Sequence, residues 1–184
     1  MKSSPWGQVQ ASTEITPNIV HVETASHGGL HCIGAAQQRI ETLFPDFKPY
    51  AGRGWYEEDC DWAIVALAHR AYFDDRRVYH AIQTVDWSVK NERSQHNWSS
   101  IGAWLNGGSL DAQSAQATAA RYLEEHGDEY EIGSIGSAPA TAGPKAWSVS
   151  LRRLKDNARR SVVMPDYPNQ KIYTEEELDA IAAA

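Results

Sequence analysis

The sequence has little of what would assign it quickly to a class of proteins. Its 184 residues include only two cysteines, Cys32 and Cys60, and they form no Cys-x-x-Cys pair. A disulfide framework is therefore excluded, and both thiols are expected to be reduced. The chain also lacks a hydrophobic run long enough to span a bilayer, and residues 1–6 lack the apolar core of a signal peptide. We expect a protein of the cytosol with no membrane partner.

Basic charge is scarce as well. The formal net charge of -7 argues against a general nucleic-acid-binding protein, because such a protein needs a basic face to replace the counterions of phosphates. Most of the clustered basic residues lie in one stretch, which contains Arg152, Arg153, Lys155, Arg159 and Arg160. This stretch is either a solvated strand or turn, or a patch that binds a phosphate or a partner. In the second case Arg152 and Arg153 are candidate binding residues.

Signature motifs of known chemistry are missing too. The sequence contains no Walker loop, dinucleotide-binding fingerprint, nucleophile elbow or zinc-helix motif. A zinc site could be assembled from His27, His31, Cys32 and Cys60, but no pair among them has the compact spacing typical of zinc sites. We expect no cofactor, with a divalent metal as the open alternative.

The order of predicted elements indicates the fold class. Residues 19–24 and 30–33 are typical of two strands of a hairpin, joined by a turn at residues 26–29. Helices are predicted over residues 35–44, 56–69, 75–85 and 111–126, and residues 91–108 are expected to be irregular. Strand patterns return at 130–135, 147–151 and 161–164, and a capping box at 174–177 begins a last helix. This order predicts a single α+β domain over residues 1–184, with an antiparallel sheet, several packed helices and a variable helical insertion at 87–130.

Tryptophan is what the sequence has in abundance, and two of the seven tryptophans enclose a run of carboxylates. The segment reads Trp55-Tyr56-Glu57-Glu58-Asp59-Cys60-Asp61-Trp62. On a helix, Glu57, Glu58 and Asp61 would share neighbouring faces, which suits a hard cation or an acid–base pair. Acidic residues in a first helical turn also stabilise the helix start, so both interpretations are open. Trp55 and Trp62 either form walls of a site or pack in the core.

His27 is the second candidate for chemistry. It lies in the segment Ser26-His27-Gly28-Gly29, where the glycines would let a substrate or phosphate approach the backbone. The imidazole could then act as a base, an acid or a ligand. The alternative is an exposed histidine in a hairpin turn.

Three segments carry a resemblance to a known family. They are Pro5-Trp6-Gly7, the run from Val22 to Gly29, and the run from Gly54 to Ala63. Together they resemble a family of small domains of unknown function found in phage, plasmid and other bacterial mobile-element genes, over roughly residues 5–73. More loosely, residues 160–165 resemble a strand of that family that precedes an acidic terminal helix. The resemblance implies a mobile-element setting and carries no reaction.

Two main hypotheses of function follow. The first is a small acidic accessory protein of a phage or mobile element that binds a host protein, with counter-defence as its role, because aromatic anchors within a charged rim give compact surfaces affinity and steering. The rival is a metal-assisted hydrolase or nucleotide-processing enzyme. In it, His27 would move the proton, and Glu57, Glu58 and Asp61 would hold a divalent ion. A purely structural or virion-associated role is the third hypothesis.

Overall fold

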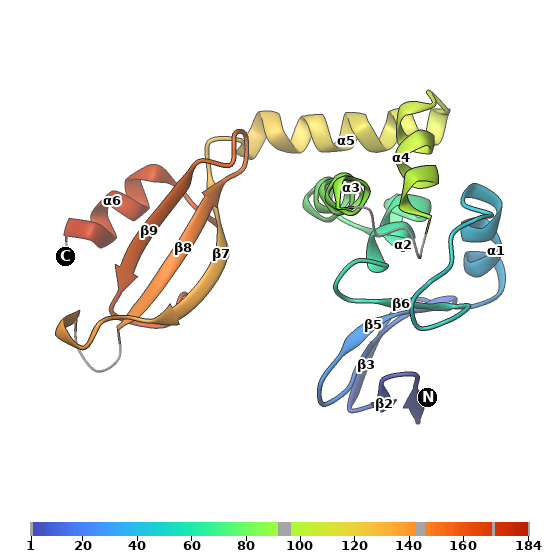
Figure 1. Ribbon diagram of the computed structural model, residues 1–184, viewed down its shortest axis with the longest axis horizontal. Helices are drawn as coiled ribbons and strands as arrows, with labels where there is room; N and C mark the ends of the chain where they lie inside the picture. Colours follow the sequence, from blue (N-terminus) through green and yellow to red (C-terminus); the bar gives the residue numbers. More distant parts are fainter. Residues whose placement is uncertain (1, 92–96, 143–145, 171, 184) are drawn as a thin grey trace. The chain divides into compact units, whose positions relative to one another are not determined.

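The computed structural model describes residues 2–91, 97–142, 146–170 and 172–183 (Figure 1). Its backbone contacts divide the chain into two compact units, unit 1 (Met1–Arg121) and unit 2 (Tyr122–Ala184). Each unit combines helices with antiparallel sheet, so the predicted α+β class is confirmed. The single domain expected for residues 1–184 stays a prediction.

Unit 1 consists of a short N-terminal hairpin, a four-stranded antiparallel sheet in the order β3-β4-β5-β6, and helices packed on the sheet. Its strands are β1 (Ser3–Ser4), β2 (Gly7–Gln8), β3 (Ala11–Thr16), β4 (Ile19–Glu23), β5 (Gly28–Cys32) and β6 (Trp55–Glu57). Its helical elements are α1 (Gly34–Leu43), α2 (Trp62–Ala68), the 3-10 helix η1 (Arg70–Tyr72), α3 (Asp75–Lys90), α4 (Trp98–Asn106) and most of α5 (Leu110–His126).

The predicted hairpin forms from β4 and β5, whose register runs from the pair Ile19 and Cys32 to the pair Glu23 and Gly28. Its turn lies at residues 24–27, because the hydroxyl of Thr24 donates to the carbonyl oxygen of His27 over 2.7 Å and accepts from the backbone amide of His27 over 3.2 Å. The turn predicted at residues 26–29 is therefore wrong by two residues: the two glycines belong to β5.

The core of unit 1 lies between the sheet and the helices. Side chains alternate along β5, so Leu30 and Cys32 are buried in the same cluster as α2, while His31 lies on the opposite face. Residues 63–68 of α2 are all buried, as expected for a short apolar helix enclosed on several sides. Figure 1 shows α1 and α2 on one side of the sheet and the N-terminal hairpin on the other.

The helix predicted over residues 56–69 is wrong at its start. Residues 55–57 form β6, which pairs with β5, and α2 begins only at Trp62. A strand suits this segment because aromatic residues favour strands and burial alternates along it: Tyr56 is buried, and its hydroxyl donates to the side-chain oxygen of Gln37 over 3.0 Å. The acidic run therefore lies in the connection between a strand and a helix.

A second difference concerns residues 91–108, which were expected to be irregular. Residues 98–106 form α4, whose buried side chains Trp98, Ile101 and Leu105 recur at helical spacing and belong to the core of unit 1. Residues 92–96 of the expected irregular segment lie outside the described residues. The stretch 87–130, interpreted as a helical insertion, holds the end of α3 together with α4 and α5.

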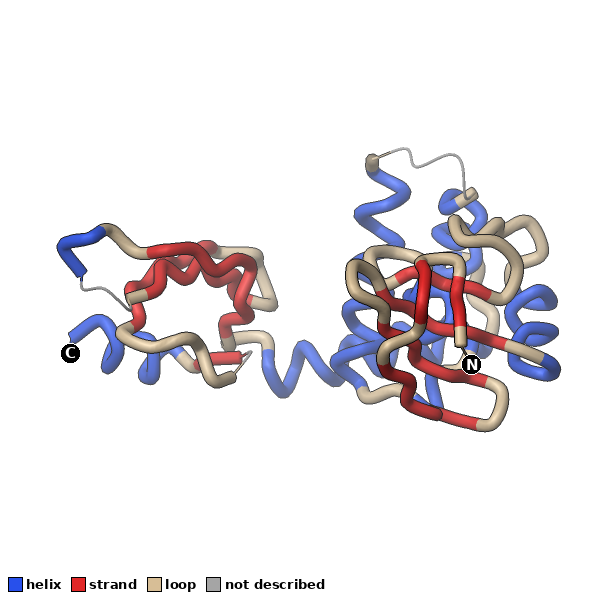
Figure 2. The backbone as a smooth tube through the Cα atoms, turned by 90° about the horizontal axis from the view of Figure 1, so that it is seen from below, coloured by secondary structure: helices blue, strands red, loops and turns tan. Residues whose placement is uncertain are grey.

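Unit 2 is a second α+β unit (Figure 2). It contains β7 (Tyr130–Ser137), the 3-10 helix η3 (Ala140–Ala142), β8 (Trp147–Arg153), β9 (Arg159–Met164), β10 (Ile172–Tyr173) and α6 (Glu175–Ala183). The strands form an antiparallel sheet in the order β10-β7-β8-β9, and Leu178 of α6 is buried in the same cluster as Val149 and Leu151. The predicted capping box is confirmed, because Thr174 and Glu177 exchange side-chain to backbone hydrogen bonds. Within the described ranges, none of the helices has the length and apolarity that crossing a membrane requires.

His69 follows α2 and is buried, with its Nε2 donating to the carbonyl oxygen of Ala36 over 3.0 Å. Burial lowers the pKa of His69 below its ordinary value of 6.5; the hydrogen bond to Ala36 opposes this shift and the charge of Arg39 adds to it. The folded chain therefore keeps this imidazole neutral where the unfolded chain takes up a proton. Its contribution to stability is complete above the ordinary pKa and is lost as the pH falls below it.

We expect His69→Gln, which keeps a side-chain N–H donor, to flatten the pH dependence of stability. As the pH falls from about 7.5 to about 5, the free energy of unfolding should decrease more in the wild type than in the variant. Urea titrations at several pH values measure this difference. Parallel curves for the two proteins would contradict the burial of a neutral histidine.

Candidate functional site

The structure brings His27 and Glu58 together at one end of the unit 1 sheet. Nδ1 of His27 lies 3.9 Å from Oε1 of Glu58, and both side chains are about half exposed. The backbone amide of Glu58 donates to the carbonyl oxygen of Gly28 over 3.1 Å. A Cβ atom on Gly28 would lie 2.9 Å from Oε2 of Glu58, so the missing side chain leaves room for this carboxylate.

Trp6 covers the neighbouring glycine. A Cβ atom on Gly29 would lie 2.5 Å from Cη2 of Trp6 and 2.3 Å from the carbonyl oxygen of Tyr56. The ring of Trp6 meets Trp55 edge-on at 5.7 Å between centroids, and Trp55 stacks on His31 at 4.0 Å. The N-terminal hairpin therefore extends a row of aromatic rings across the sheet face that lies opposite the helices.

A cavity of about 280 Å³ lies beside this row, and we call it the acidic–aromatic pocket. It is lined by Trp6, His27, Tyr50, Glu57, Asp59, Cys60, Asp61 and Trp98. Three of the four residues predicted to carry chemistry, His27, Glu57 and Asp61, thus line one pocket. The fourth, Glu58, is not part of the lining but lies beside His27. The sequence pattern did not identify Trp6, Tyr50 or Trp98 as part of a site.

The carboxylates of this segment do not act as one cluster. Glu57 accepts hydrogen bonds from three backbone amides, those of Asp59 (2.6 Å), Cys60 (2.9 Å) and Asp61 (3.4 Å). Asp61 is buried and accepts from the backbone amide of Tyr50 over 2.6 Å. Asp59 is exposed, and no hydrogen bond to its carboxylate is found within the described part of the chain. The shared helical face predicted for Glu57, Glu58 and Asp61 is therefore wrong, because these residues precede the helix.

Trp98 is a buried residue of the pocket lining. Only 1% of its surface is exposed, and its ring meets Phe47 edge-on at 5.2 Å between centroids. Its indole Nε1–H is buried and finds no acceptor among the residues that the structure describes. A buried donor without a partner carries a free-energy cost.

Several predicted binding residues lie outside the pocket lining. Ser26 is exposed in the hairpin turn. The ring of Trp62 carries the guanidinium of Arg77 at 4.9 Å, a cation–π contact. In unit 2, Arg153 pairs with Asp156 at 2.7 Å.

The rest of the basic stretch in unit 2 is also largely paired. Arg152 lies 3.8 Å from Glu131, Lys155 forms an ion pair with Asp128, and Arg160 contacts two acidic side chains near the start of α6. These contacts neutralise much of the charge that the sequence shows as one run, which favours a solvated, ion-paired surface over a phosphate-binding patch.

A zinc site would require the four candidate side chains to meet around one point. Over the residues that the structure describes, no three His, Cys, Asp or Glu side chains are placed to hold one metal ion. His31 and Cys32 lie on opposite faces of β5, and burial raises the pKa of the Cys32 thiol to about 12. The set His27, His31, Cys32 and Cys60 is therefore not assembled as a zinc site.

Comparisons with known proteins give one match. No curated protein and no solved structure matches the chain. The model of a protein family described as a domain of unknown function (DUF7007) matches residues 1–121, which is the extent of unit 1 and includes α3, α4 and the acidic–aromatic pocket. Because this match covers more than half of the sequence, the chain belongs to the DUF7007 family.

Proposed function

We propose that this protein is a cytosolic accessory protein of a phage or another mobile element that acts by binding a host protein, with counter-defence as its role. The observation that supports this proposal is the acidic–aromatic pocket. Its rings and carboxylates have the chemistry that receives a basic side chain, so the proposed partner presents a lysine or arginine to it.

The aromatic walls suit a cation with an apolar stem. Tyr50 is 73% exposed beside the pocket, and the rings of Trp6 and Trp98 form other walls. A guanidinium or ammonium group over such rings is attracted by their quadrupoles, and the methylene stem covers apolar surface. The volume of about 280 Å³ lies just below the usual range for ligand pockets, which favours one side chain over a large cofactor.

The acidic residues of the pocket have two roles: some stabilise its structure, and one is available to a ligand. Glu57 and Asp61 accept hydrogen bonds from backbone amides and thereby hold the pocket in shape. Asp59 is exposed and lines the pocket, so its carboxylate is the one most available to a bound cation. The net charge of -7 would also speed the approach of a basic surface.

We expect Asp59→Lys to weaken binding to the host partner by about tenfold or more, because the change replaces an attractive charge by a repulsive one. Capture from host lysate, quantified for the partner recovered in stoichiometric amount, measures the effect. Glu14→Lys is the matched control, since Glu14 is exposed on β3 and does not line the pocket. Equal recovery by both variants, or no partner at low salt, would contradict the proposal.

The alternative is a metal-assisted hydrolase or nucleotide-processing enzyme that uses His27 and the Glu57–Asp61 segment. The approach of His27 to Glu58 at 3.9 Å favours it, because a carboxylate beside an imidazole can orient the ring for proton transfer. Calorimetric titration with Mg²⁺, Mn²⁺ and Zn²⁺ distinguishes the two functions. Heat of binding that is lost in His27→Ala would favour the enzyme; no heat for any of the ions, with His27→Ala fully functional, would eliminate it.

A further inference from the structure

A second and larger cavity of unit 1 has a different chemical character. Its volume is about 460 Å³, and it lies between the β3–β4 turn, α1 and the end of α2 with η1. It is lined by Thr16, Asn18, Ile19, Ala35, Ala36, Arg39, Ala68, His69, Arg70, Ala71 and Tyr72. We call it the arginine pocket. None of its lining residues belongs to the acidic–aromatic pocket.

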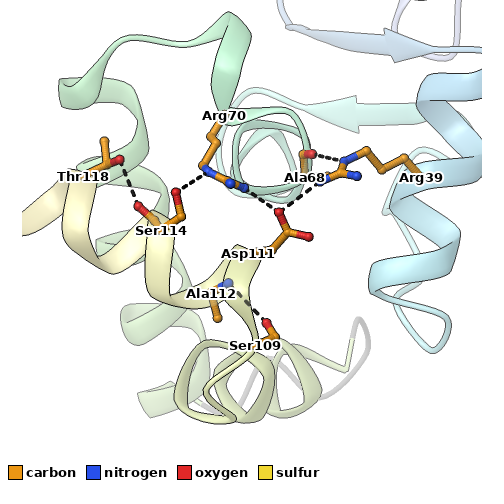
Figure 3. Close-up of polar contacts among 8 residues, drawn as sticks. All are labelled: Arg39, Ala68, Arg70, Ser109, Asp111, Ala112, Ser114 and Thr118. Atoms are coloured by element: carbon orange, nitrogen blue, oxygen red, sulfur yellow. Dashed lines mark hydrogen bonds and ion pairs between the residues drawn. The ribbon is translucent and has the colours of Figure 1, made fainter.

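The two arginines are held in place by hydrogen bonds to Ala68, Asp111 and Ser114 (Figure 3). Arg39 donates from Nε to the carbonyl oxygen of Ala68 over 2.6 Å and from Nη2 to Asp111 over 3.1 Å. Arg70 donates from Nε to the hydroxyl of Ser114 over 3.0 Å and from Nη1 to the same oxygen of Asp111 over 2.8 Å. A bound ligand would therefore meet guanidinium groups whose positions are already fixed.

The charges around the pocket do not cancel. Two guanidinium groups share the single carboxylate of Asp111, which is not part of the pocket lining. The hydrogen bond to Arg70 is the main cause that lowers the pKa of Asp111, so this carboxylate is ionised and the trio keeps one positive charge. His69 adds none, because burial lowers the pKa of its imidazole.

Donors remain on both arginines. Each guanidinium carries five N–H groups. Two of them are engaged on Arg39 and two on Arg70 in the contacts found among the described residues. The remaining N–H groups match the fork geometry with which arginine binds carboxylates and phosphates.

The remaining walls combine small apolar residues with the polar side chains of Thr16, Asn18 and His69. Four of the lining residues are alanines, Ile19 is buried, and the ring of Tyr72 is 58% exposed. The volume falls inside the usual range for small-molecule sites, which bury an apolar body and fix it by a few polar groups. Alanines leave room where larger side chains would fill the cavity.

We propose that the arginine pocket binds a small organic anion, whose carboxylate or phosphate group pairs with Arg39 and Arg70 and whose apolar body lies against the alanines. The site is independent of the proposed binding of a basic side chain. A fixed pair of guanidinium groups with one excess positive charge, in a cavity that also presents four alanines, is the arrangement that recognises such a ligand.

Phenyl phosphate and benzoate are the probes, and neutral benzamide is their control. Amide chemical shifts of the ¹⁵N-labelled full chain report the site of binding. We expect saturable shifts around residues 35–39 and 68–72 with a Kd on the order of millimolar, because ligands of this size bind weakly. In Arg39→Gln, the Kd should rise about tenfold or more. In Arg53→Gln, which removes an exposed arginine paired with Glu41 outside the pocket, the Kd should not change.

A second variant tests the site without removing an arginine, so that loss of binding in Arg39→Gln is not confused with loss of folding. Ala35→Trp places a large ring at an exposed position of the lining and leaves both arginines intact, so it should also abolish the shifts. Tighter binding of phenyl phosphate would assign the site to phosphate monoesters, and tighter binding of benzoate to carboxylates. The proposal would be overturned by no saturation with either probe at concentrations on the order of 20 mM. Equal binding of benzamide, or an unchanged Kd in both variants, would overturn it as well.

Discussion

Gly29→Ala is expected to destabilise unit 1 by about 3 kcal/mol, because the added methyl group enters a space that is already filled. Its Cβ would lie 2.3 Å from the carbonyl oxygen of Tyr56 and 2.5 Å from the ring of Trp6. The carbonyl belongs to β6, which pairs with β5 at this point. The steric clash can therefore be removed only if the strand shifts and Trp6 moves away from the sheet. Denaturant titrations followed by tryptophan fluorescence measure the change.

The neighbouring Gly28 provides a matched comparison. Its Cβ would meet the end of the flexible side chain of Glu58 at 2.9 Å and the carbonyl oxygen of Val22 at 3.1 Å. The carboxylate can turn away, so Gly28→Ala should cost roughly 1 kcal/mol. Equal stability of Gly29→Ala and the wild type would mean that Trp6 does not rest on this glycine.

The second large effect is expected in α2. Leu67 is completely buried, and Leu67→Ala should lower the free energy of unfolding by about 2–5 kcal/mol through lost contacts and the cavity that remains. Leu110 is 85% exposed, so Leu110→Ala is a control with the same chemical change. Its free energy of unfolding should stay within about 0.5 kcal/mol of the wild-type value. Similar urea midpoints for the two variants would contradict the position of α2 at the centre of the core.

The regular elements with strong local signals could be predicted from the sequence. The β-branched run at residues 19–22 gave the hairpin strand, and α3 begins where Asp74 accepts from the backbone amide of Arg77, as a capping residue does. The box of Thr174 and Glu177 was equally local. These features depend on residues within one or two turns of each other, which is the range over which sequence patterns carry structural information.

The acidic segment shows where local reasoning fails. Carboxylates after an aromatic pair also occur at helix starts, and the pattern cannot show that Tyr56 is buried beside β5. Residues 55–57 form a strand because they pair with β5, which is distant in the sequence. The carboxylate of Glu57 then accepts hydrogen bonds from backbone amides of the turn that follows. α4 was not predicted for a similar reason. Its buried face packs against residues that are distant in the sequence, so the local pattern does not reveal it.

Part of the acidic–aromatic pocket could be predicted from the sequence, namely three of its eight lining residues. His27 and the carboxylates were identified because histidine beside glycines and clustered acids are unusual. Trp6, Tyr50 and Trp98 come from three other parts of the chain, and nothing local connects them with His27. A signal for Trp6 was present in Gly29, because a glycine inside a strand often marks the close approach of another group.

We propose that the acidic–aromatic pocket receives a basic side chain. Titration of the full chain with short blocked peptides that contain arginine, lysine or the uncharged glutamine tests it most directly, with Trp6→Ala and Asp59→Lys as pocket variants and Glu14→Lys as control. We predict saturable changes in tryptophan fluorescence with the arginine and lysine peptides only, an affinity at least about tenfold weaker in both pocket variants, and weaker binding as salt is raised. Equal binding of the glutamine peptide, or undiminished binding by the pocket variants, would contradict the account.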